Sequence, residues 1–101
     1  MENIRHSASK LIELAELAFE ASNLFEKAAV YSATQRIKDD FTNLYDKKEV
    51  CLSLYESILS IVTFISEVVG FEPLGSDLET LRVFINNDVV KLNADIQKFY
   101  W

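Results

Sequence analysis

The sequence predicts an all-α antiparallel helical bundle. Two Gly and one Pro among 101 residues leave little material for turns, so long helices with few connections are expected. Apolar residues make up 50% of the chain and recur with the three-and-four spacing of a helical face. This length is typical of one domain, so residues 1–101 are expected to form a single helical bundle.

The first helical stretch extends from Ile4 to Tyr45, a range that contains no Gly or Pro. Asn23 and Glu26 could form a capping box that starts a new helix within it. However, the apolar pattern passes through residues 22 and 23 without a change of phase, which favours one continuous helix over a break at Asn23. One face carries small or apolar residues throughout: Ile4, Ala8, Leu11, Ala15, Ala18, Ser22, Phe25 and Ala29.

The second helical stretch follows a predicted hairpin turn, where Asp46 and Glu49 can form a capping box. It is too long for a strand and keeps a helical period. Gly70 fits the left-handed position after a helix end, and Pro73 prevents continuation of the helix. The main apolar face, expected to be the most buried in the chain, contains Val50, Leu54, Tyr55, Ile58, Ile61, Val62, Ile65, Val68 and Val69.

The last helix is predicted to begin with a capping box of Ser76 and Glu79, after a loop over residues 71–75. Two bundles fit these segments: one long and two shorter helices, or four similar helices that run up-down-up-down. The apolar face of the last helix contains Leu78, Leu81, Ile85, Val89, Leu92, Ile96 and Phe99.

The sequence carries no catalytic, metal or nucleotide signature. His6 is the only histidine, and no nucleophile or second metal ligand lies near it in the sequence. Cys51 is the only cysteine, which excludes an internal disulfide and suits a small apolar core residue. Gly70 and Gly75 are isolated, whereas a phosphate-binding loop needs clustered glycines. We therefore expect no enzymatic activity, no catalytic residues, no metal site and no cofactor.

The charge balance limits the classes of partner. Ten Lys and Arg against sixteen Asp and Glu give a net charge of -6, which repels nucleic acid and anionic lipid. We therefore expect neither nucleic acid nor a membrane as a partner. The N-terminal residues do not resemble a secretory signal, and the uncharged run over residues 57–66 is about half the length that crosses a bilayer, so a cytoplasmic location is expected.

The length of a continuous first helix predicts an interface. A helix from Ile4 to Tyr45 would be roughly 60 Å long at about 1.5 Å per residue, and the later helices could not cover all of its apolar face. Small residues on that face would admit a partner helix, in a homodimer or with another protein. Two aromatic residues at the C-terminus could also anchor a partner. The predicted interface residues are Ala8, Leu11, Ala15, Ala18, Ser22, Phe25, Tyr100 and Trp101.

These observations predict a non-enzymatic protein–protein interaction module of unknown partner, such as a small subunit, an adaptor, a chaperone or an immunity-type binding protein. The alternative is an acidic inhibitor or regulator that binds a basic protein surface. A steep loss of partner affinity with added salt would favour the alternative.

Overall fold

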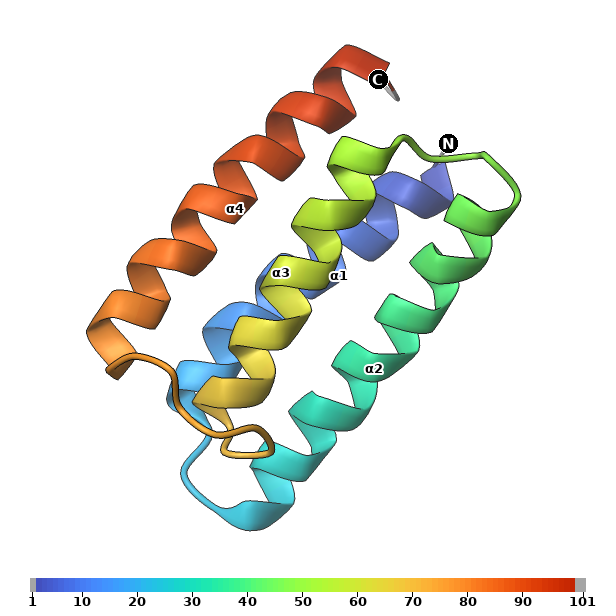
Figure 1. Cartoon of the computed structure of the whole chain (residues 1–101). Coiled ribbons are helices and arrows are strands. Elements are labelled where there is room, and N and C mark those ends of the chain that lie inside the picture. The colour runs from blue at the N-terminus through green and yellow to red at the C-terminus, as the bar shows by residue number, and fades with distance from the viewer. Residues whose placement is uncertain (1, 100–101) are drawn as a thin grey trace.

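The computed structural model describes residues 2–99. This part of the chain contains four helices joined by short loops. They are α1 (Glu2–Glu20), α2 (Leu24–Asp46), α3 (Leu52–Val68) and α4 (Leu78–Phe99). Each helix runs antiparallel to the next, so the start of α1 and the end of α4 lie at the same end of the bundle (Figure 1). The all-α antiparallel bundle is confirmed, in its form with four helices of similar length.

The break between α1 and α2 shows that the preference for a continuous first helix was wrong. Asn23 is the N-cap of α2, with an extended backbone, and its side-chain oxygen accepts a hydrogen bond of 2.8 Å from the amide of Glu26. The Glu26 carboxylate accepts bonds from the amide of Ser22 at 2.9 Å and from its hydroxyl at 3.0 Å. This capping box satisfies polar groups that a helix end leaves without partners, which favours a turn despite the unchanged apolar phase.

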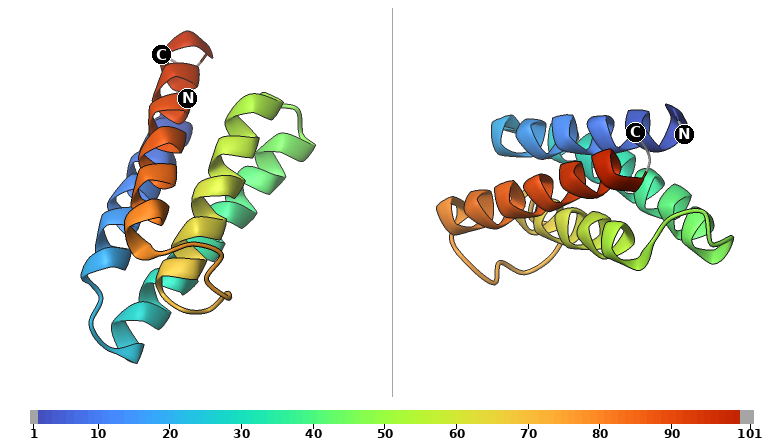
Figure 2. Two further views of the ribbon diagram at one scale, coloured as in Figure 1. Left: turned by 60° about the vertical axis from the view of Figure 1, so that its left-hand side comes forward. Right: turned by 90° about the horizontal axis from the view of Figure 1, so that it is seen from above.

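Helix α3 occupies the centre of the bundle. It packs most extensively against α4 and also against α2 and α1. Helix α1 contacts all three other helices, but its contact with α4 is the least extensive. Helices α2 and α4 lie on opposite sides of α3 and do not touch (Figures 1 and 2). The bundle is therefore built around α3 rather than around an open central axis.

The predicted apolar faces of α3 and α4 meet in one hydrophobic core. The exceptions are Leu78 and Phe99 at the ends of α4, which are half exposed, and Leu81, which is fully buried but lies outside this cluster. Helix α1 contributes Leu11 to this core and helix α2 contributes Phe41, and both side chains are fully buried. The largest fully buried apolar side chains are Leu11, Phe41, Leu54, Ile58, Ile61, Ile65, Leu81 and Leu92.

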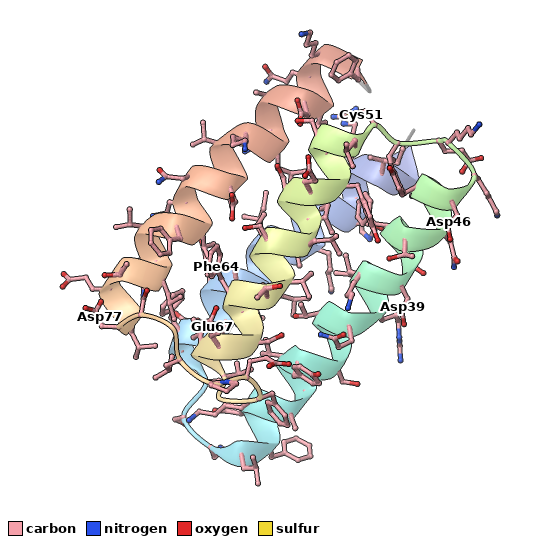
Figure 3. The ribbon with its side chains drawn as sticks, in the orientation of Figure 1. Asp39, Asp46, Cys51, Phe64, Glu67 and Asp77 are labelled. Carbon is pink, nitrogen blue, oxygen red and sulfur yellow. The ribbon has the colours of Figure 1, made fainter. Side chains whose placement is uncertain are left out.

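Three side-chain pairs link α3 with α4. Two are hydrogen bonds from a serine hydroxyl to an aspartate, and the third is an aromatic contact with ring centroids 5.4 Å apart. The two serines are seven residues apart, and so are the two aspartates, which is the repeat of coiled-coil packing. Phe64 lies between α3 and α4 (Figure 3). From one end of the interface to the other, the pairs are Ser53 with Asp95, Ser60 with Asp88, and Phe64 with Phe84.

Helix α3 ends at Val68 with Val69 as its C-cap, and Gly70 takes the left-handed position after the helix end, as the sequence predicts. Gly70 has a φ of 85°, and its amide donates to the carbonyl of Glu67 at 3.1 Å. The amide of Phe71 donates to the carbonyl of Ser66 at 3.0 Å, which completes the Schellman pattern of a helix C-terminus. The ring of Phe71 stacks on Tyr31 of α2 at 4.5 Å, so the loop is attached to the bundle.

The predicted capping box at Asp46 is wrong. Asp46 is the last residue of α2, because the amides of Lys48 and Glu49 donate to the carbonyls of Tyr45 and Leu44 and so end the helix after it. Lys48 adopts the left-handed conformation there, with a φ of 62°. Helix α3 then starts after Cys51, whose side chain makes no capping bond.

The start of α4 differs from the prediction by one residue. Asp77 rather than Ser76 is the cap, since a carboxylate oxygen of Asp77 accepts a bond of 2.7 Å from the amide of Thr80. The amide of Gly75 donates to the carboxylate of Glu67 at 2.7 Å, which holds the preceding loop against the end of α3 (Figure 3). The loop thereby reaches residue 77 before the helix begins.

Truncation of the α3 core should destabilise the fold strongly. Ile58 and Ile65 are completely buried, so Ile→Ala at either position should lower the free energy of unfolding by about 2 to 5 kcal/mol through lost burial and a residual cavity. Urea denaturation measures this change. The control is Glu16→Ala at an exposed position of α1, which should change stability by less than about 0.5 kcal/mol. Equal costs for the two kinds of substitution would show that the buried faces are assigned wrongly.

Two helices are followed by a residue with a left-handed backbone conformation, and substitutions at these two residues should change the stability of the fold in opposite directions. Lys48→Gly should raise the free energy of unfolding by about 0.5 to 1 kcal/mol, because a lysine pays a steric cost at positive φ that glycine avoids. Gly70→Ala should lower it by about 1 kcal/mol for the same reason. Apart from the glycine and its two chain neighbours, no heavy atom lies within 4 Å of a Cβ placed at Gly70, so backbone strain alone would act. Thermal or urea unfolding of the two variants checks this, and a change of the same sign in both would contradict it.

Candidate protein-binding surface

Large exposed apolar side chains gather at one end of the bundle. This end holds the last turn of α1, the first turn of α2, the loop between α3 and α4, and the start of α4 (Figure 1). It lies opposite the end that holds the start of α1 and the close of α4. Six of the eleven exposed large hydrophobic residues in the described range belong to it, and we call them the apolar end: Leu17, Leu24, Phe25, Phe71, Leu74 and Leu78.

Leu24 and Phe25 are the most exposed of these side chains, at 74% and 84%. Both lie in the first turn of α2, directly after the capping residue Asn23. The cap fixes the backbone of this turn, so the two side chains project from an ordered helix. Exposing so much apolar surface on a fixed element is unfavourable in water, and it is typical of interaction surfaces.

A hollow of about 370 Å³ lies beside Phe25, between α1 and α2. Its volume falls within the range of about 300 to 1,000 Å³ seen for ligand sites, although it is an open groove. We call it the α1–α2 groove. It combines apolar and small side chains with two carboxylates, and its lining residues are Leu17, Glu20, Ala21, Phe25, Glu26, Ala29 and Val30.

Two smaller hollows, of about 110 and 240 Å³, lie between α1 and α4. They follow from the limited packing of these two helices, where Ala15 and Ala8 contribute little side-chain volume. The guanidinium of Arg82 lies 4.1 Å from the centroid of the Phe19 ring and ties α4 to α1 at one of them. Neither hollow reaches the volume typical of a ligand site.

The structure separates the predicted interface residues into three groups. Ser22 and Phe25 are exposed at the turn between α1 and α2. Tyr100 and Trp101 lie outside the described residues. The remaining four residues form part of the chain's own core, with at most 4% of their surface exposed: Ala8, Leu11, Ala15 and Ala18.

This burial corrects the expectation of an interface along the α1 stripe. The break at Asn23 allows α2 to return along α1, and α3 also packs against α1. The small residues therefore admit helices of the same chain. The apolar surface that motivated a homodimer through Ala18 is used within one copy.

Sequence reasoning missed Leu17, Leu24 and Leu74 as surface residues. One signal was present, since Leu24 and Phe25 are consecutive large apolar residues at the start of a helix. Neighbouring positions on a helix differ by about 100° in direction, so both are buried only where other helices cover a wide face, as they do for Ile61 and Val62. Leu17 gave no comparable signal, because its spacing from the other apolar residues of α1 is the same as that of a buried residue.

Other chemical groups in the described range do not assemble into a site. His6 is exposed in α1, and Cys51 is half-buried at the start of α3. No three His, Cys, Asp or Glu side chains among the described residues lie close enough to hold a metal ion. In the same range, no helix combines the length and the hydropathy needed to cross a bilayer.

Comparisons with protein-family models, with curated proteins and with solved structures find no match to this chain. No relative therefore supplies a function that could be tested against these residues.

The capping carboxylates should make the stability of the fold dependent on acid. The backbone amide and the hydroxyl of Ser22 lower the pKa of Glu26 below its ordinary value of 4.5, and the amide of Thr80 lowers the pKa of Asp77 below 3.8. A lowered pKa stabilises the folded state at pH values above the unfolded pKa, and this contribution disappears as the pH falls through the folded pKa. Between about pH 5 and pH 3 the free energy of unfolding should therefore fall.

The double variant Glu26→Gln with Asp77→Asn isolates these two groups. It should be less stable than the wild type at pH 7, where the carboxylates are charged, and it should lose less stability on acidification. Urea denaturation at pH 7 and pH 3 measures both quantities. An equal loss in the two proteins would show that neither carboxylate is responsible.

Proposed function

We propose that this protein is a non-enzymatic binding module that docks another protein on its apolar end. The observation that carries the proposal is the exposure of Leu24 and Phe25 on a capped, ordered turn of α2. Contiguous apolar side chains at the surface are typical of protein–protein interaction sites. Aromatic side chains are also enriched among the residues that contribute most to binding energy.

The position of the apolar end supports a binding role over a structural one. The core already contains large buried residues from all four helices, so Leu24 and Phe25 are not needed to complete it. Phe71, itself a residue of the apolar end, stacks on Tyr31 and thereby joins the loop to α2. A small subunit, an adaptor, a chaperone and an immunity-type protein would all use the surface in this way.

An acidic inhibitor or regulator is the second candidate. The observation that favours it is the presence of two carboxylates, Glu20 and Glu26, among the residues that line the α1–α2 groove. A basic partner surface would then contribute more to recognition than apolar contact. Strong salt dependence of the affinity, together with tolerance of Phe25→Gln, would favour this candidate over the first.

Site-specific photo-crosslinking tests the proposal. A benzoylphenylalanine residue at position 25 should crosslink in cells to a discrete partner protein, whereas the same residue at position 52 should not. Leu52 is the matched control, because it is a large apolar residue, 53% exposed, in the first turn of α3 at the other end of the bundle. In a pull-down without the crosslinker, the captured partner should bind Leu52→Gln as it binds the wild type and should be lost from Phe25→Gln. Equal capture from both positions would contradict the proposal.

A further inference from the structure

We infer that the α1–α2 groove binds a basic amphipathic helix of the partner protein. This inference rests on the proposed function and adds the chemical class of the segment that is bound. The groove residues that carry it are Leu17, Glu20, Phe25 and Glu26.

The shape and composition of the groove favour a helix. Ala21 and Ala29 are small, so they leave room between the larger side chains of Leu17 and Phe25. An apolar groove of this kind receives the apolar face of a helix through anchors spaced three, four and seven residues apart. The described residues contain no strand, so the partner cannot pair with a sheet edge.

The charge around the groove specifies the residues that flank the apolar face of that helix. Glu20 and Glu26 line the groove, and Glu13 lies four residues before Leu17 on the same face of α1. The bonds from Ser22 keep the Glu26 side chain beside the turn. Lysine or arginine side chains that flank the apolar anchors would therefore meet carboxylates near this turn.

The acidic part of the groove is short. Lys10 lies on the face of α1 that carries Leu17, seven residues before it, and Arg36 lies on the face of α2 that carries Phe25, eleven residues after it. Both are exposed and both lie farther from the turn than the carboxylates. The basic residues of the partner should consequently gather at the end of its helix that lies near Ser22.

The same charges disfavour two other occupants. A second copy of this chain, docked through the same groove about a twofold axis, would bring the groove carboxylates of both copies together. An anionic lipid surface would be repelled by Glu20, Glu26 and a net charge of -6. A basic segment of another protein meets the apolar and the charge requirement together.

Binding of two designed peptides tests the inference. One is a helical peptide of Leu and Lys with leucines on one face, and the other replaces every Lys by Glu. Fluorescence anisotropy should show binding of the Leu/Lys peptide and none of the Leu/Glu peptide. Phe25→Gln should weaken the binding about tenfold or more, and Leu52→Gln should leave it unchanged. Amide chemical-shift changes on binding should concentrate in residues 17–30.

A pair of charge reversals separates local recognition from attraction to the whole acidic chain. Glu20→Lys in the groove and Glu56→Lys on the exposed side of α3 change the net charge equally. Glu20→Lys should weaken binding of the Leu/Lys peptide about threefold to tenfold, with little effect from Glu56→Lys. Equal effects of the two reversals, or equal binding of both peptides, would overturn the inference.

The outcome also distinguishes this inference from the proposed function. If crosslinking at position 25 captures a partner but the Leu/Lys peptide does not bind, the binding module stands and the basic helix is wrong. If vesicles that contain anionic lipid bind the protein through Phe25 and the peptide does not, the occupant is a membrane and the inference fails. A wild-type dimer that Phe25→Gln dissociates in light scattering would assign the groove to a second copy and would also overturn it.

Discussion

Three hydrogen bonds around Asn23 and Glu26 hold the turn between α1 and α2. Because the chain reverses there, α2 packs beside α1 and α3, and Ala8, Ala15 and Ala18 become core residues instead of an open face. The same reversal places Phe25 at an end of the bundle, where the described chain provides little cover for it. One local capping arrangement therefore determines which part of the long apolar pattern is buried and which part is presented to solvent.

Helical period and glycine placement could be predicted from the sequence, whereas most helix starts could not. Ile58 and Ile65 follow a period that a strand cannot produce, and Gly70 occupies a conformation that other residues avoid. At the start of α4, however, Ser76 and Asp77 both carry oxygens that can cap a helix. Asp77 is the one that caps the helix, and the preceding loop is held through Gly75 by Glu67, a contact that the local sequence pattern does not reveal.

The turn at Asn23 shows why an apolar pattern alone is ambiguous. A short connection between two helices can leave the spacing of apolar residues in phase by coincidence, so an unchanged phase does not require one helix. The pattern also identifies apolar residues without revealing what covers them. Ala15 and Phe25 share the predicted stripe, yet Ala15 is buried by the chain's own helices and Phe25 is the most exposed of the large hydrophobic residues in the described range.

The three side-chain pairs between α3 and α4 differ in how well they specify one alignment. A slip of α4 by seven residues in one direction would pair Ser60 with Asp95, and a slip in the other direction would pair Ser53 with Asp88. Either misaligned interface would thus regain one hydroxyl–carboxylate bond of the kind that the native alignment contains. The Phe64–Phe84 contact has no such duplicate, because the two slips would place Lys91 or Asp77 opposite Phe64. The polar pairs are interchangeable, so among these three side-chain pairs only the aromatic contact distinguishes the native register from the two slips.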